Sequence, residues 1–138
     1  MNQLNSVVIE GNVCHEPKIV ATSQYTNDKL VVFTIANHRY YRGKDGEKKE
    51  DTTFIDIETW GYLAEKILEI QKGTLTRISG RVRMFSWLDK NTGKKQYKIV
   101  ICAEHVDYLK KINGKEEEVN IDVGSVNMVE EPIIIYSE

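Results

Sequence analysis

Residues 53–72, TFIDIETWGYLAEKILEIQK, pass from the periodicity of a strand to that of a helix within one short stretch. In the first eight residues apolar and polar side chains alternate, which is typical of a strand with one buried face. Apolar side chains then recur at helical spacing at Leu63, Ala64, Ile67 and Leu68. Gly73 suits the position just after a helix end. The stretch therefore predicts a strand over 53–60 followed directly by a helix over roughly 61–72.

Segments rich in β-branched and aromatic residues flank this stretch and predict four more strands. They are residues 6–13, 29–38, 74–88 and 96–109. The polar segment 39–52 contains the turn signal Asp45-Gly46 and predicts an exposed loop or hairpin arm, and residues 89–95 predict a turn. Three strands, a helix and two strands are the order of an OB-fold. We therefore expect an all-β domain with one helix, built as a five-stranded OB-fold barrel.

The charge of the chain divides it into two parts. Of 138 residues, 41% are hydrophobic and 29% charged, which is a globular composition. Residues 1–112 hold 18 basic and 14 acidic side chains, a balance of +4, whereas residues 113–138 hold one basic and seven acidic, a balance of −6. We expect a binding domain over 1–112 and a short acidic C-terminal tail, a candidate flexible segment, over 113–138.

The sequence also indicates where the protein resides. No apolar run is long enough to span a membrane, and the first residues lack the basic and apolar regions of a signal peptide. Cys14 and Cys102 do not form the framework of a disulfide-rich domain. We therefore expect a reducing compartment such as a cytoplasm.

Aromatic side chains share strand faces with charged ones. In residues 54–60, Ile55 and Ile57 lie on one face, and the other face carries Phe54, Asp56, Glu58 and Trp60. In residues 81–87, Val82 and Met84 share one face, and the other carries Arg81, Arg83, Phe85 and Trp87. Aromatic platforms among cations are what non-specific binding of single-stranded nucleic acid requires, because bases stack on the rings while cations neutralise phosphates.

The cations available for phosphate contacts lie mainly in the two polar loops and on the arginine-bearing strand. They are Arg39, Arg42, Lys44, Lys48, Lys49, Arg81, Arg83, Lys94, Lys95 and Lys98.

Several segments together resemble the bacterial single-stranded DNA-binding protein family, the homotetrameric type with one OB-fold in each subunit. The matching segments are VVIEGNV with Glu16-Pro17, VVFTIAN, RYYRGKDGEKKEDTTFIDIETWGYLAE, KGTLTRISGRV and SWLDKNTGKKQYKIVICAEHV, which cover about residues 4–109. The resemblance implies a non-enzymatic protein that coats single-stranded DNA in replication, recombination and repair in a bacterial cytoplasm or nucleoid. It also implies a homotetramer in which strand 6–13 and its neighbours form subunit contacts.

The resemblance assigns base stacking to four aromatic positions: Tyr41, Phe54, Trp60 and Trp87. Simple alternation from Val31, Phe33 and Ile35 places Tyr41 on the core face instead. The resemblance therefore implies either a bulge near Tyr40 or a different register.

The C-terminus departs from the family pattern of a long linker and an acidic tip that ends in Pro-Phe and docks partner proteins. An acidic-Pro-apolar element is present at Glu130, Glu131, Pro132 and Ile133, but the terminal phenylalanine is absent. Two alternatives stay open for this element: a diverged docking tip, or a strand that pairs with another subunit.

Other functions fit less well. Cys102 and His105 face opposite ways on a strand, which is poor geometry for zinc, so we expect no metal or other cofactor. No phosphate-binding Gly-Lys-Ser/Thr loop is present. The alternatives are a primosomal or phage-type single-strand binder that works as a dimer, an OB-fold nuclease that holds a metal through Asp56 and Glu58, and an OB module that binds only protein.

Overall fold

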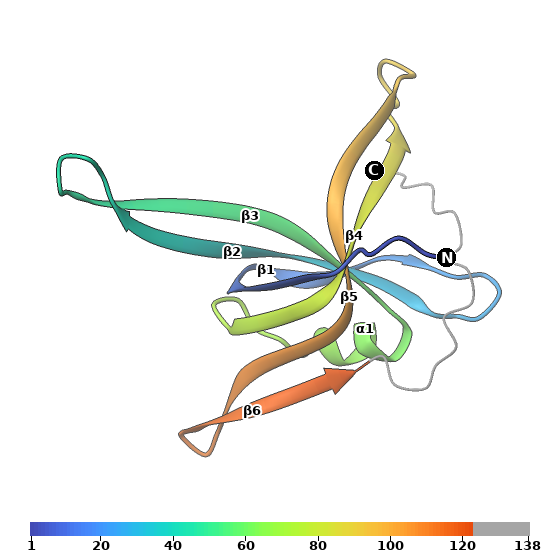
Figure 1. Ribbon diagram of the computed structural model, residues 1–138. Coiled ribbons are helices and arrows are strands. Elements are labelled where there is room, and N and C mark those ends of the chain that lie inside the picture. The colour runs from blue at the N-terminus through green and yellow to red at the C-terminus, as the bar shows by residue number, and fades with distance from the viewer. Residues whose placement is uncertain (123–138) are drawn as a thin grey trace.

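The computed structural model describes residues 1–122 and contains six strands and one short helix (Figure 1). In chain order the elements are β1 (Val7–Thr22), β2 (Lys29–Arg42), β3 (Lys48–Trp60), α1 (Gly61–Ile67), β4 (Leu75–Leu88), β5 (Lys95–Ile112) and β6 (Lys115–Asp122). In this part of the chain no helix is long and apolar enough to cross a membrane.

The strands form one sheet that closes on itself. Its order is β3-β2-β1-β4-β5-β6, with antiparallel neighbours and an additional parallel pairing of β3 with β5. That pairing closes β1 to β5 into the five-stranded barrel that the order of the elements predicts, so the expected OB-fold is confirmed. The closure is short: only Ile57 with Ile101 and Glu58 with Cys102 are in register.

The core fills the barrel and is sealed by α1. Phe33, Ile35 and Ile57 point inward from β2 and β3, and the helix contributes Leu63 and Ile67. Each side chain of this size contributes about 1.5–3 kcal/mol when it is fully buried. The predicted inward face of Ile55 and Ile57 is correct: Ile57 is fully buried and Ile55 packs against the core.

The helix ends earlier than the sequence predicts. The last helical hydrogen bond runs from the Leu68 N–H to the Ala64 carbonyl, and Glu69 and Ile70 continue in tighter turns that bond to the residue three positions earlier. Gly73 (φ 90°) gives its N–H to the carbonyl of Val13 on β1 and not to the helix. The pairing with β1 therefore turns the chain toward β4 before the predicted end at residue 72.

The structure also differs from the prediction after residue 112. Residues 115–122, expected to be part of the tail, form β6 in antiparallel pairing with β5. Asn113 and Gly114 both have positive φ, as a two-residue type I′ hairpin turn requires. Ile121 is buried, so this strand adds to the core. Residues 123–138, including Glu130, Glu131, Pro132 and Ile133, lie outside the described residues.

Gly80 explains how β4 bends around the barrel. A Cβ at this position would overlap the carbonyl oxygen of Cys102 on β5. Before Gly80 the even-numbered residues Thr76 and Ile78 are buried. Beyond Gly80 the odd-numbered Phe85 is buried and Met84 is exposed, so the strand face that points into the barrel changes at the bend.

Candidate nucleic-acid interface

Two long hairpins extend from the closed barrel and diverge from the point where β3 meets β5 (Figure 1). We call the β2–β3 hairpin, residues 37–53, the first arm, and the β4–β5 hairpin, residues 84–99, the second arm.

 The two arms carry ten of the predicted site residues, and Phe54 lies just beyond the first arm. The ten are Arg39, Tyr41, Arg42, Lys44, Lys48, Lys49, Trp87, Lys94, Lys95 and Lys98.

The register of the first arm decides which aromatic side chains share a face. β2 and β3 pair without a shift from Leu30 opposite Trp60 to Arg42 opposite Lys48. Phe54 and Tyr40 therefore lie on one face, and Tyr41 lies on the face that continues into the core at Ile35. The bulge that the resemblance implies near Tyr40 is absent from this pairing, so that expectation is wrong. Tyr40 is 71% exposed and Tyr41 40% exposed.

The sequence analysis missed His38, which joins Tyr40 on the same face. The two rings stack with centroids 6.5 Å apart. His38 Nδ1 lies 2.8 Å from Glu50 Oε1 and 3.1 Å from Thr52 Oγ1 across the hairpin. Phe54 pairs with Ala36, and counting every second residue along β2 from Ala36 leads to His38 and Tyr40, so strand alternation could have identified both. On the opposite face, the Arg39 guanidinium lies 5.2 Å from the centroid of the Tyr41 ring.

The second arm carries a stacked aromatic pair. The rings of Phe85 and Trp87 lie 5.6 Å apart at an interplanar angle of 20°. Phe85 is buried and Trp87 is half-buried, whereas Val82 and Met84 on the other face are exposed. Lys98 Nζ lies over both rings, 5.7 Å from the centroid of Phe85 and 6.0 Å from that of Trp87.

Trp60 closes the base of the first arm, where β3 ends and α1 begins. Its side chain is half-buried, and its indole Nε1 is buried with no hydrogen-bond partner among the described residues. Phe54, six residues earlier on the same face, is 67% exposed. The face predicted to carry both aromatics thus passes from an open end at Phe54 to a nearly enclosed end at Trp60.

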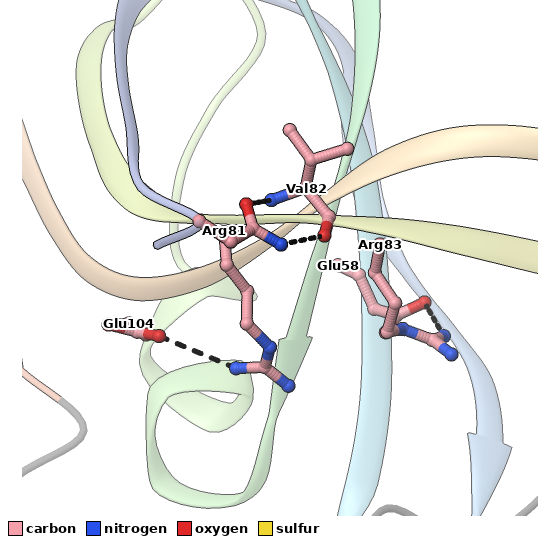
Figure 2. A network of polar contacts seen from close by, with 6 residues as sticks. Glu58, Arg81, Val82, Arg83 and Glu104 are labelled. Carbon is pink, nitrogen blue, oxygen red and sulfur yellow. Dashed lines mark hydrogen bonds and ion pairs between the residues drawn. The ribbon is translucent and has the colours of Figure 1, made fainter. Parts of the chain in front are cut away.

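The two predicted arginines of β4 point toward carboxylates (Figure 2). Arg83 donates from Nε to Glu58 Oε1 at 2.9 Å and from Nη2 to Oε2 at 2.7 Å. Glu58 is only 1% exposed, so this carboxylate, on the face opposite Ile55 and Ile57, is buried against its partner. Arg81 Nη1 lies 3.4 Å from Glu104 Oε1. In the free protein both guanidinium groups therefore already have a carboxylate partner.

Asp56 is held in the fork between the arms. Thr34 Oγ1 donates to its Oδ1 at 2.6 Å, and Lys98 Nζ donates to its Oδ2 at 2.7 Å. Burial raises the pKa of Asp56, but the hydrogen bonds from Lys98 and Thr34 and the positive charge of Lys98 outweigh it and hold the pKa below its ordinary value.

The remaining predicted cations gather at the tips of the arms. Arg42, Lys44, Lys48 and Lys49 lie at the tip of the first arm, and Lys94 and Lys95 at the tip of the second. All six are exposed, and Lys95 Nζ lies 5.5 Å from the centroid of the Tyr97 ring. The structure thus places exposed cations outward on each arm and paired cations near the barrel.

Within residues 1–122, no three His, Cys, Asp or Glu side chains are arranged to hold a metal ion. Cys102 is buried in the barrel, and Cys14 Sγ lies 3.6 Å from the carbonyl oxygen of Asn12. The arrangement offers aromatic rings and cations rather than groups placed for chemistry.

Comparison with known proteins shows which family the chain resembles. Residues 4–109 match the family described as "Single-strand binding protein family". The single-stranded DNA-binding protein of Aquifex aeolicus is 33% identical over 114 residues, which cover 82% of this chain and 75% of that protein. The protein of the same name from Deinococcus radiodurans is 33% identical over 111 residues, which cover 80% of this chain and 36% of that protein.

Solved structures share the fold. A deletion mutant of the single-stranded DNA binding protein from Thermus aquaticus superposes with a TM-score of 0.65 at 22% identity, covering 83% of this chain and 54% of that one. A Plasmodium falciparum SSB in complex with ssDNA superposes with a TM-score of 0.64 at 19% identity, covering 88% of this chain and 98% of that one.

Proposed function

Because this chain belongs to the single-strand binding protein family, we propose that it binds single-stranded DNA without sequence preference, by stacking bases on aromatic rings and by pairing phosphates with lysine and arginine. Members of this family bind DNA and are not enzymes, and roles in replication and repair are typical of them. The proposed tasks are to protect exposed strands and to remove hairpins. Removing a hairpin needs no ATP, because a protein that binds only the unpaired state shifts the equilibrium by mass action.

The observation that carries this proposal is the placement of aromatic side chains along both arms and at their junction. Phe54 is exposed at the base of the first arm, and Trp87 lies stacked on Phe85 in the second. Base stacking on such rings contributes about 1–3 kcal/mol per base and tolerates every base. Trp60 at the end of β3 extends the path toward the barrel.

The register of the first arm adds Tyr40 to the proposed stacking set. Tyr40 shares its face with Phe54, whereas Tyr41 faces the other way and has Arg39 over its ring. A strand of DNA that contacts Phe54 therefore meets His38 and then Tyr40 along this hairpin.

Phosphate contacts are proposed to come first from the exposed cations at the tips of the arms. Arg42, Lys44, Lys48 and Lys49 extend the path beyond Tyr40, and Lys94 and Lys95 extend it beyond Trp87. Each neutralised phosphate releases counterions, so affinity should fall as salt rises.

We propose that the protein self-associates, as a homotetramer, through an exposed apolar surface on β1 and on the second arm with its base. Exposed apolar side chains gather on the outward faces of β1, β4 and β5, at Val8, Val82, Met84, Tyr97 and Ile99. Apolar surface of this kind marks an interaction site in soluble proteins. Light scattering of the purified chain separates a tetramer from the dimer of the alternative primosomal or phage-type binder. We place its activity in a bacterial cytoplasm or nucleoid.

The nuclease alternative has little support from the geometry. Asp56 is bonded to Lys98 and Thr34, and Glu58 to Arg83, so both carboxylates have cationic partners in place of a metal. Incubation of DNA with the protein and Mg²⁺ tests this alternative, since cleavage would contradict the proposed function.

Intrinsic tryptophan fluorescence during titration with long oligothymidylate, at low and high salt, tests the proposal itself. We expect saturable quenching of Trp60 and Trp87 and an affinity that falls with salt. A folded protein that shows no binding at low salt would exclude it, and would favour an OB module that binds only protein.

A further inference from the structure

Asp56 and Lys98 lie where the two arms separate. β3 and β5 pair only at Ile57 with Ile101 and at Glu58 with Cys102, and toward the arm tips the strands part. The ion pair of Asp56 with Lys98, 2.7 Å long, spans this fork just beyond the paired residues. It therefore links the first arm to the second at the base of both.

Lys98 also covers the aromatic pair of the second arm. Its Nζ lies over the rings of Phe85 and Trp87, at distances typical of a cation–π contact. A base that stacks on the covered face of Trp87 has to move this ammonium group. The position of Lys98 is set by Asp56, whose other oxygen is fixed by Thr34.

We propose that Asp56 competes with DNA for Lys98: in the free protein the carboxylate holds the ammonium group over Trp87, and the ammonium group passes to a phosphate when a base stacks there. This inference rests on the proposed function. Asp56 is then a positioning residue that lowers affinity for single-stranded DNA and weakens its dependence on salt, because part of the charge of Lys98 is already neutralised.

The test is a salt-dependent titration of the full chain with oligothymidylate, using Asp56→Asn. This variant keeps an oxygen that can accept the hydrogen bond of Thr34 but removes the charge. We expect about two- to fivefold tighter binding at low salt, the range of a partly exposed ion pair. The slope of log affinity against log salt should steepen by as much as about 0.7, the value for one phosphate of a single strand.

Asp51→Asn is the matched control, because Asp51 is on the same strand but the opposite face. The gain of Asp56→Asn over this control should disappear when Lys98→Gln is added. A gain that survives Lys98→Gln, or no gain over Asp51→Asn, overturns the inference. Thr34→Val, which removes only the hydroxyl that orients Asp56, is the second variant if Asp56→Asn does not fold, and should shift affinity in the same direction.

The experiment distinguishes a failure of the proposed function from a failure of this further inference. If the wild-type chain does not bind oligothymidylate, the proposed function is wrong. If the wild-type chain binds and Asp56→Asn binds no more tightly than Asp51→Asn, only the competition of Asp56 with DNA is excluded.

Discussion

Arg83 holds the carboxylate of Glu58 through two parallel hydrogen bonds, and the two partners differ sharply in their access to water. The side chain of Glu58 is 1% exposed and that of Arg83 is 30% exposed. The pair connects β3 to β4 across β5, next to the short closure of the barrel.

The difference in exposure predicts unequal effects on stability. Arg83→Met leaves Glu58 as an unpaired buried charge and should lower the free energy of unfolding by about 3–5 kcal/mol. Glu58→Leu leaves Arg83, which can reach water, and should lower the free energy of unfolding by less than Arg83→Met does. Urea unfolding of both variants measures this, and the double variant should recover part of the loss. Equal losses in the two single variants would contradict the assignment.

Removing a stacking ring should weaken DNA binding while the fold survives. We expect Trp87→Ala and Trp60→Ala each to lose about 1–3 kcal/mol of binding free energy for each base stacked. Fluorescence anisotropy of labelled oligothymidylate measures the affinity, and thermal melting checks the fold. Unchanged affinity in both folded variants would argue against stacking at these positions.

Tyr40 and Tyr41 form a matched pair that tests the register of the first arm. Because Tyr40 shares a face with Phe54, Tyr40→Ala should weaken binding by about 1–3 kcal/mol, and Tyr41→Ala by less. The same anisotropy titration compares them. A larger effect at Tyr41 would favour the assignment that the family resemblance implied.

The lowered pKa of Asp56 predicts how the stability of the protein depends on pH. Its pKa in the folded protein lies below the ordinary value of 3.8, so its contribution is fully present above that value and is lost as pH falls through the lower folded pKa. Lys98 and His15 are the positive groups near this carboxylate. The unfolding free energies of wild type and Asp56→Asn should differ by up to about 1 kcal/mol at pH 7, and the difference should shrink by pH 3. A constant difference across this range would show that the charge of Asp56 contributes nothing.

β6 should contribute to the stability of the domain. Ile121→Ala should lower the free energy of unfolding by about 2 kcal/mol or more, because the side chain is buried against the core. Glu117→Ala, on an exposed position of the same strand, is the control and should change little. If both variants unfold like the wild type, residues 115–122 belong to the tail.

The sequence predicted the barrel well where one periodicity governed a whole element. Alternation over 53–60 identified β3 and its inward isoleucines, and the following change of period identified α1. It overestimated the length of α1, because the pairing of Gly73 with Val13 depends on a strand distant in sequence. It missed β6, although Asn113-Gly114 is a hairpin signal, because the glutamates that follow resemble a solvated tail.

The candidate site was harder to predict from the sequence, since alternation gives the face of a residue but not its partner. Alternation predicts the strand faces of Phe54, Trp60 and Trp87, but the burial of Glu58 and its pairing with Arg83 depend on strands brought together by the closure of the barrel. The stacking role that the resemblance implies for Tyr41 conflicts with simple alternation, and the register of β2 and β3 follows the alternation.

The short closure between β3 and β5 has a consequence for solubility. If the two strands part, the barrel becomes an open sheet whose edges expose unpaired N–H and C=O groups, and such edges pair readily with other chains. Beyond the closure, β6 covers the edge of β5 from His105 to Ile112. The ion pair of Asp56 with Lys98 joins β3 to β5 beside this closure, and the ion pair of Glu58 with Arg83 joins β3 to β4, so both should help to keep the barrel closed and the protein free of aggregation.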